Sequence, residues 1–462
     1  MAEEELDVRL LVDEKHERVV LAESSKDFVD TLLSFLTLPA GTVVRLLGKR
    51  ASLGCMDHLY QSVEKLDTEH LQTRACKAML LSPVSASHRR CENLKLRADD
   101  KWPQKFFSCP KCGFPPKGSG MFSLVPDTLC ACGRIMVQQR DVHLCKKHSG
   151  ANGVDGVFVK GGAMFLVTDD LRVAESSVEN ALAVFRRYGI QDGNGLEERF
   201  VKIGRSRILK LLERSLVSRT PLTDVFLETS STSDFEDVID LTYISEGGRP
   251  CRNDMASESK EMVVRLLRDK SNDDVIYAEG GEDFVDLLFS FLTLPLGSLV
   301  RLSGGSSSIG SVDNLYRSVE QLGDYIRSEN CKLELIAPKL ASSFSCDVLV
   351  SLLGVEEDNS CISCDVTGVE AKVFAVNPKS LLPSKELGGA YMKGPRKFLI
   401  TDTMDVSPFN SREALDLVFS KDVYFENLRE ETVTLGEAEA LKLLKACWVS
   451  SRTLTDAFAK FF

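Results

Sequence analysis

Four cysteines in two close pairs are the residues of this chain whose types and spacing best suit chemistry. Cys109 and Cys112 stand in CPKCG, and Cys130 and Cys132 stand in CACG, 17 residues further on. The glycine after each pair lets the backbone curl toward the thiolates, although the second pair is CxC rather than the usual CxxC. Four soft thiolates favour zinc and leave no coordination position open for water. We therefore predict a structural zinc site at these four residues.

Other metal-binding side chains lie nearby and leave the ligand set open. His143, Cys145 and His148 follow in HLCKKH, and His88 and Cys91 precede the first pair. They can replace a ligand of the second pair or form a second site. Surface residues around a metal loop are the interpretation that we favour for them.

The elements that must position these cysteines belong to a chain that repeats itself. Residues 27–66 and 283–322 are aligned at a constant offset of 256 and share 25 identities in 40 positions. Such a match predicts two tandem homologous units, over residues 6–227 and 260–459. Residues 228–259 are rich in Ser, Thr, Asp and Glu and predict an acidic linker. The cysteine pairs fall in an insertion of the first unit, at about residues 86–150.

Each unit opens with the same predicted elements. Two short apolar runs on either side of a polar turn predict a β-hairpin, at 8–12 with 18–22 and at 263–267 with 275–279. An apolar stretch of helical period begins at Phe28 and ends before Pro39, and residues 57–66 predict a second helix. The segment between them reads as a further strand or a short helix. We therefore expect an α+β fold in each unit.

The second unit serves as a control for the metal site. Cys361 and Cys364 correspond by position to the second cysteine pair, and the first pair has no counterpart. Two thiolates seldom hold zinc, so we expect that this unit has lost the site, with a residual site involving Cys346 as the alternative. Two further cysteines of the first unit have counterparts in the second, and buried thiols are expected there: Cys76 with Cys331 and Cys91 with Cys346.

The sequence carries no recognisable catalytic motif. All six histidines lie in the first unit, and a glycine-rich phosphate loop, a nucleophile elbow and an HExxH helix are absent. Several polar residues recur in both units, and helix ends and turns explain their positions better than two pockets do. These pairs are Asp27 and Asp283, Asp30 and Asp286, Arg45 and Arg301, Tyr60 and Tyr316, Lys160 and Lys393, Asp169 and Asp402, and Asp224 and Asp456.

Composition limits the cellular setting and the partners. The first residues lack the profile of a targeting peptide, and the apolar stretches are too interrupted to span a membrane. Fourteen cysteines without a secretory signal indicate a reducing compartment, the cytoplasm or the nucleus. The net charge of −11 disfavours a protein devoted to nucleic acid, but residues 86–150 hold 12 Lys or Arg against 5 Asp or Glu. An anionic partner for this segment therefore stays open.

Three long motifs carry a resemblance to a known family. They are DFVDxLxSFLTLPxGxVxRL near the start, GVFVKG with FLVTDDLRV in the middle, and LKLLERSLVSRTPLTDVF at the end. With these motifs the chain resembles the plant family catalogued as domain of unknown function 674, over nearly its whole length. The resemblance implies a plant-specific protein that often carries the unit in tandem. It implies no activity and no catalytic residues.

These observations favour an intracellular adaptor or protein-interaction protein with a structural zinc site and no catalytic activity. The expected partner is a protein, and the oligomeric state stays open. Two alternatives remain. One is a nucleic-acid binder that uses the basic zinc segment, and the other is an enzyme of unfamiliar type with a site between the units.

Overall fold

A computed structural model of the chain describes ten stretches of residues: 4–48, 53–101, 105–113, 120–140, 155–227, 262–358, 362–365, 370–381, 388–421 and 423–459. We call residues 4–227 the N-terminal half and residues 262–459 the C-terminal half. The predicted linker at 228–259 lies outside the described residues. None of the helices described is long and apolar enough to cross a lipid bilayer.

Each half contains one five-stranded antiparallel sheet, and both sheets have the same strand order. The N-terminal sheet runs β10 (Leu196–Ile203), β1 (Leu6–Asp13), β2 (Arg18–Ser24), β8 (Phe165–Thr168), β9 (Val173–Glu175). The C-terminal sheet runs β17 (Leu428–Leu435), β11 (Met262–Asp269), β12 (Val275–Gly281), β15 (Lys397–Thr401), β16 (Val406–Pro408). The predicted hairpins are confirmed as β1–β2 and β11–β12.

Helices of the N-terminal half follow the apolar periodicity of the sequence. Phe28, Leu32 and Leu36 are fully buried, and Pro39 stands directly before the next helix, where its fixed φ suits a helix start. The segment that reads as a strand or a short helix is helix α2. The helices are α1 (Lys26–Ser34), η1 (Phe35–Thr37), α2 (Ala40–Leu47), α3 (Met56–Lys65), η2 (Thr68–His70), α4 (Arg74–Leu81), α5 (His88–Cys91), α6 (Val178–Tyr188), α7 (Arg205–Val217) and α8 (Pro221–Phe226).

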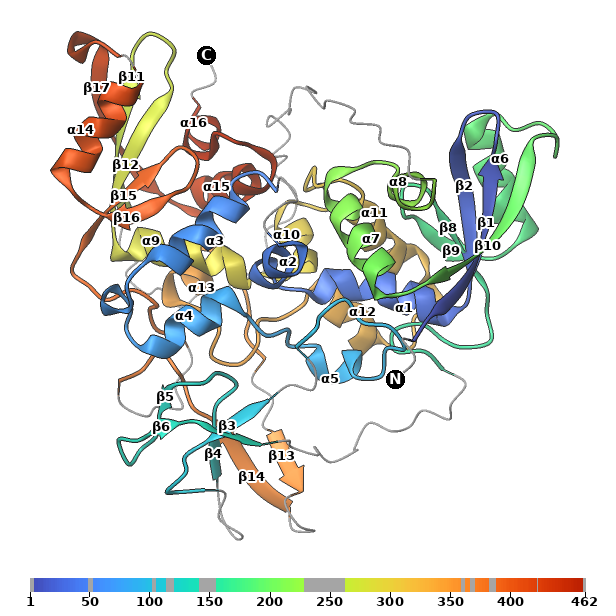
Figure 1. The fold of residues 1–462 in the computed structure, drawn as a ribbon, viewed down its shortest axis with the longest axis horizontal. Helices are drawn as coiled ribbons and strands as arrows, with labels where there is room; N and C mark the ends of the chain where they lie inside the picture. The colour runs from blue at the N-terminus through green and yellow to red at the C-terminus, as the bar shows by residue number, and fades with distance from the viewer. Residues whose placement is uncertain are drawn as a thin grey trace.

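Helices of the C-terminal half come in nearly the same order. They are α9 (Glu282–Ser290), η3 (Phe291–Thr293), α10 (Leu296–Leu302), α11 (Val312–Gln321), η4 (Gly323–Tyr325), α12 (Glu329–Ile336), α13 (Asp347–Leu353), α14 (Ser411–Ser420), η5 (Phe425–Asn427), α15 (Glu437–Val449) and α16 (Thr453–Ala457). The two sheets stand at opposite ends of the molecule, with the helices between them (Figure 1). The mixed helices and antiparallel sheets confirm an α/β chain, whereas the two-unit repeat and its boundaries stay predictions.

One helix of each half packs on the sheet of the other half. Ser62 in α3 accepts a hydrogen bond on Oγ from the backbone N–H of Val406 in β16, at 2.8 Å. Ser318 in α11 accepts the matching bond from Val173 in β9, at 2.9 Å. One hydrophobic core therefore runs continuously through both halves.

The two halves also meet directly at the middle of the molecule. The N–H of Ala40 donates to the carbonyl of Leu294 at 2.9 Å, and the N–H of Leu296 donates to the carbonyl of Leu38 at 3.0 Å. These two bonds join the segments that precede α2 and α10, so the starts of both helices are held by the opposite half.

A small lobe below the helices combines strands from both halves (Figure 1). In it, β4 pairs in parallel with β14 of the C-terminal half, and the N–H of Val376 donates to the carbonyl of Phe122 at 2.9 Å. The strands of the lobe are β3 (Phe106–Ser108), β4 (Gly120–Phe122), β5 (Thr128–Leu129), β6 (Ile135–Met136), β7 (Gln138–Arg140), β13 (Ile362–Asp365) and β14 (Glu370–Ala375).

Candidate metal centre

The four predicted cysteines lie together in the small lobe, on two tight turns. The first turn follows β3, and the N–H of Gly113 donates to the carbonyl of Cys109 at 2.8 Å. The second turn joins β5 to β6, and the N–H of Gly133 donates to the carbonyl of Cys130 at 2.8 Å. Both glycines have positive φ, 58° and 78°, a region where a side chain would be strained. Each glycine therefore allows its turn to close around the sulfurs.

The sulfur positions suit a tetrahedral ion. All four Sγ atoms lie within 4.8 Å of one another. Cys109 Sγ is 3.5 Å from Cys132 Sγ, and Cys112 Sγ is 3.8 Å from Cys130 Sγ. A tetrahedral zinc ion with bonds of about 2.3 Å keeps its sulfur ligands about 3.8 Å apart. The cluster can therefore hold a metal ion with little rearrangement.

The cluster is closed on its inner side and open on its outer side. Cys109 and Cys130 are buried, whereas Cys112 and Cys132 are exposed. The two buried cysteines belong to a small apolar cluster with Phe107, Met136 and Val376. Val376 comes from the C-terminal half, so the metal-binding turns pack directly against a strand end of that half.

The four thiols influence one another's ionisation in opposite directions. Burial raises the pKa of Cys109, but N–H groups of Cys112 and Lys111 and the neighbouring thiols outweigh it and bring the pKa down to about 6. Contacts with the thiols of Cys132 and Cys130 raise the pKa of Cys112 to about 12. One thiolate forms readily, and further negative charge is resisted. A divalent cation removes this conflict, because coordination keeps thiols deprotonated.

The alternative ligands do not join the cluster among the described residues. His88 and Cys91 line a separate cavity. His143, Cys145 and His148 lie outside the described residues, as does Cys361 and the side chain of Cys364. Cys346 is buried, and its sulfur lies 3.7 Å from the carbonyl of Asp286 in the C-terminal half. Within the part of the chain that the structure describes, the four cysteines are the one group able to hold a metal.

The recurring aspartates of α1 and α9 hold the chain rather than a ligand. Asp30 accepts N–H bonds from Val157, Phe158 and Val159, at 2.6, 2.7 and 3.0 Å. Asp286 accepts two such bonds, both at 2.8 Å, from residues 391 and 392. Burial raises the pKa of Asp30 to about 6 and the pKa of Asp286 to about 8. Each carboxyl group thus fixes the segment that carries the FVKG or YMKG motif.

Other recurring polar residues have structural partners as well. Asp169 accepts from the N–H and the hydroxyl of Thr223, and Asp402 does the same for Thr455. The Tyr60 and Tyr316 hydroxyls donate to the carbonyls of residues 81 and 336. These side chains bond helix ends and turns, which is the role that the sequence analysis favoured for them.

Two features escaped the sequence-based prediction. Lys379 is buried, and its ammonium donates to the carbonyl of Ser343 and lies 5.2 Å from the ring centroid of Tyr391. At the offset of 233 that aligns FVKG with YMKG, position 379 corresponds to Lys146, which lies outside the described residues. The second feature is a pair across the halves, His58 Nδ1 with Asp405 Oδ2 at 3.1 Å. Asn314 at the matching position donates to the carbonyl of Asp170.

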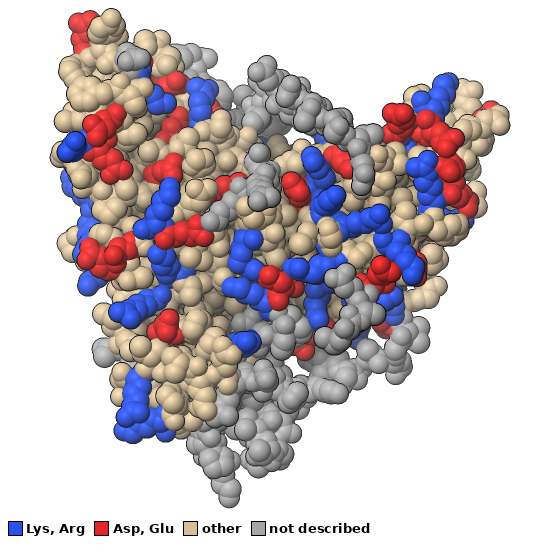
Figure 2. Space-filling model, in the orientation of Figure 1, with Lys and Arg blue, Asp and Glu red and all other residues tan. Residues whose placement is uncertain are grey.

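Charged side chains of both signs cover the face of the molecule seen in Figure 2. Basic residues gather over the central helices, with acidic residues between them. Several described basic residues of the segment 86–150 and its surroundings are neutralised. Arg90 pairs with Glu334 at 2.7 Å, and Arg45 pairs with Asp99 and Asp100 at 2.8 and 2.6 Å. This face therefore presents mixed charge rather than one basic stripe.

Comparison with known proteins gives one match. The family described as "Protein of unknown function (DUF674)" matches residues 2–438. No curated protein and no solved structure matches the chain. The long shared motifs and this match cover almost the same part of the chain.

Proposed function

The chain belongs to the DUF674 family of proteins of unknown function, and we propose that it is a non-catalytic protein-interaction protein with a structural zinc ion. Zinc is the metal that four thiolates select, and the closed ligand set leaves no position for a substrate. Ten cysteines with described side chains are free thiols, which supports a reducing compartment such as the cytoplasm or nucleus.

The zinc ion would hold the small lobe together. Its four ligands come from two turns separated by 17 residues of chain, and the lobe has short strands and a small apolar cluster of its own. Such a lobe buries little apolar area, so metal binding would supply much of its stability. Since β4 pairs with β14, the ordered lobe would also bind part of the C-terminal half.

The observation that carries the interaction function is an exposed apolar cluster at the far end of the C-terminal half. We call it the α14 cluster, and it consists of Leu415, Phe419, Tyr424 and Phe425. Phe419 is 58% exposed and Phe425 is 63% exposed, and their ring centroids lie 6.0 Å apart. Ala414 and Val418 on the same helix are buried. A helix that buries one apolar face and exposes aromatic residues on another is typical of a binding surface.

A capture experiment tests this function. The tagged chain and the double variant Phe419→Ser with Phe425→Ser are used side by side to capture proteins from plant extract, the source that the family resemblance implies. Val178→Ser is the control, because Val178 is 78% exposed on α6, the helix at the matching place in the N-terminal half. We expect a specific partner with the wild type and the control and its loss with the double variant. Equal recovery with all three, or no partner above background, would contradict the proposal.

A further inference from the structure

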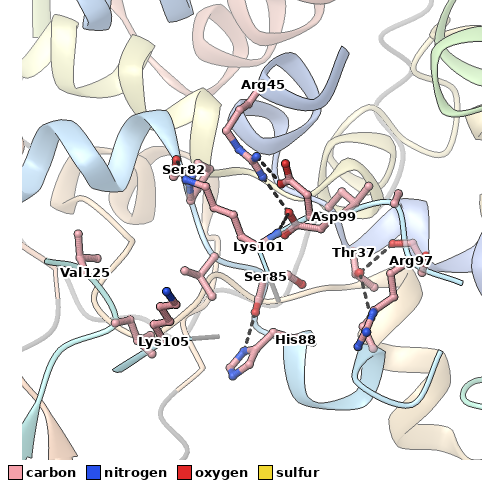
Figure 3. A pocket seen from close by; sticks show the side chains of 18 of the residues that line it. Thr37, Arg45, Ser82, Ser85, His88, Arg97, Asp99, Lys101, Lys105 and Val125 are labelled. Carbon is pink, nitrogen blue, oxygen red and sulfur yellow. Dashed lines mark hydrogen bonds and ion pairs between the residues drawn. The ribbon is translucent and has the colours of Figure 1, made fainter. Parts of the chain in front are cut away.

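A cavity of about 550 Å³ lies in the N-terminal half, apart from the cysteine cluster. Its walls come from α2, α4, α5 and the segment that follows α5, together with one edge of the small lobe. Apolar side chains such as Leu38, Leu94 and Val125 form part of the lining, and polar side chains from several directions complete it (Figure 3). A cavity of this size with a few convergent polar groups is typical of a small-molecule site.

One buried acceptor in the lining has no partner. His88 Nδ1 lies 2.9 Å from the carbonyl of Ser85. A carbonyl only accepts, so Nδ1 carries the proton, and in a neutral ring Nε2 is then an acceptor. Burial lowers the pKa of His88 to about 4, so the ring is neutral at physiological pH. Nε2 is buried, and none of the described residues donates a hydrogen bond to it. Buried polar groups normally have a partner, so this atom indicates a missing donor.

Cationic side chains of the same lining outnumber its carboxylates, with Arg45, Arg97, Lys101 and Lys105 against Asp99 and Asp100. Lys101 donates to the hydroxyl of Ser82 and lies between Arg45 and Ser85 in Figure 3. The terminal nitrogens of Arg45 donate to Asp99 and Asp100, but its Nε is buried and has no hydrogen-bond partner among the described residues. The lining therefore carries a net positive charge, and one of its N–H donors, Arg45 Nε, lacks a hydrogen-bond partner within the described ranges.

The C-terminal half has no histidine at the corresponding position. At the offset that aligns Cys91 with Cys346, His88 corresponds to Ser343 and Ser85 to Leu340. The Ser343 carbonyl accepts from the buried ammonium of Lys379. Leu340 exchanges backbone hydrogen bonds with Glu356 and Asp358, at 2.9 and 2.8 Å. The unpartnered histidine is therefore a feature of the N-terminal half alone.

We propose that this cavity binds a small organic acid with an apolar body, an O–H or N–H group that donates to His88 Nε2, and an anionic group that Lys101 and Arg45 contact. The apolar lining contacts the body of the ligand, and the buried acceptor selects molecules that carry a donor. This site is independent of the α14 cluster, so either proposal can fail without the other.

Two fluorescent probes of related shape test the site in the full-length protein. The first, 8-anilinonaphthalene-1-sulfonate, has an aromatic body, one N–H and an anion. The second, N-phenyl-1-naphthylamine, has the same N–H and no anion. We expect saturable binding of the first probe at one site per chain. His88→Ser introduces the residue found at the matching position 343 of the C-terminal half. It should weaken the binding of both probes about tenfold, the effect of one lost hydrogen bond.

Lys101→Ala separates the anion contact from the rest. This variant should weaken the binding of the sulfonate probe several-fold and change the affinity for the neutral probe by no more than about twofold, because only the first probe carries an anion. Lys95→Ala is the control, since Lys95 is exposed on the same segment and does not line the cavity. Lys101 lies at the surface, so its variant should fold even if His88→Ser does not. No saturable binding, or equal loss of both probes with Lys101→Ala and Lys95→Ala, would overturn the proposal.

Discussion

Asp30 and Asp286 occupy matching positions in α1 and α9, yet their carboxyl groups are bonded differently. Asp30 uses both oxygens, with Oδ2 accepting from Val157 and Oδ1 from the next two residues. Asp286 uses Oδ1 for both of its bonds, and its buried Oδ2 has no hydrogen-bond partner in the part of the chain that the structure describes. An asparagine keeps Oδ1 and replaces Oδ2 with an N–H₂ group. The same substitution therefore has opposite consequences at the two positions.

Asp286→Asn should make stability less dependent on pH. Burial raises the folded-state pKa of Asp286 to about 8, above its ordinary value of 3.8. The contribution of this residue to stability is therefore fully present below about pH 4 and is lost as the pH rises through about 8. The free energy of unfolding of the variant should therefore rise relative to that of the wild type, by at most about 1.4 kcal/mol per pH unit between about pH 4 and pH 8. Urea unfolding from pH 5 to pH 8.5 measures the difference, and a constant difference would contradict the assignment.

Asp30→Asn should instead destabilise the chain. Its new N–H₂ group would face the N–H of Val157, which now lies 2.6 Å from Oδ2. Two donors would then oppose each other in a buried place, at a cost of about 1–3 kcal/mol. Urea unfolding at pH 6 compares this variant with Asp286→Asn, which keeps both of its backbone bonds and serves as the control. Equal stability of the two variants would show that Oδ2 of Asp30 does not matter.

The cysteine cluster makes a prediction about metal content. Cys109→Ser and Cys112→Ser should each reduce bound zinc from about one ion per chain to almost none and destabilise the small lobe by about 4 kcal/mol or more. Elemental analysis of the purified protein gives the first result, and limited proteolysis within residues 105–140 gives the second. Lys111→Ser, in the same turn, should retain the metal. Unchanged zinc and unchanged proteolysis in the cysteine variants would contradict a structural metal.

The sequence predicted some of these residues better than others. Each cysteine pair closes a local turn, so the spacing within a pair predicted that turn, whereas the approach of Cys109 to Cys132 and of Cys112 to Cys130 depends on the tertiary structure. The partners of Asp30 lie about 127 residues away along the chain, and no local pattern announces them. The cavity was missed because its lining includes irregular segments without periodicity, around Arg97 and Val125.

At the scale of elements, the segments that precede α3 and α11 approach the opposite half closely. Gly54 has a φ of +56°, and a Cβ there would lie 2.7 Å from the carbonyl oxygen of Cys447 in α15. At Gly310 a Cβ would lie 2.4 Å from the carbonyl oxygen of Ser215 in α7. The helical periodicity predicted α3 itself, but it could not show that α3 packs on β16, because the partner comes from the other half.

Gly54→Ala tests this close approach, with Gly48→Ala as the matched control. Gly48 also has a positive φ, +67°, but a Cβ there would meet no atom of the described residues within 4 Å. The control should cost about 1–2 kcal/mol for backbone strain alone. Gly54→Ala adds a clash with the backbone of α15, worth roughly 1–3 kcal/mol more. Urea unfolding of the full chain measures both, and equal costs would show that α15 yields to the new side chain without loss.

At the scale of the whole molecule, the halves share one core and exchange helices. Ser62 accepts a hydrogen bond from β16 and Ser318 accepts one from β9, while a backbone hydrogen bond from Ala40 to Leu294 joins the halves at the centre. The duplication predicted two equivalent sets of elements, and the two sheets agree with that in strand order. The duplication gave no reason to expect that α3 packs on the C-terminal sheet and α11 on the N-terminal sheet. Each helix could equally have packed on the sheet of its own half.

The exchange predicts that the halves stay together after the chain between them is cut. A protease site inserted within residues 228–259 would give two fragments that share the continuous core, so they should co-elute in gel filtration and unfold in one cooperative transition. Gly54→Ala in the cut protein should promote separation, since its clash lies between the fragments, whereas Gly48→Ala should promote it less. If the cut fragments separated on dilution and each kept its own cooperative unfolding, each half would hold a complete core, and the exchanged helices would contribute little to its stability.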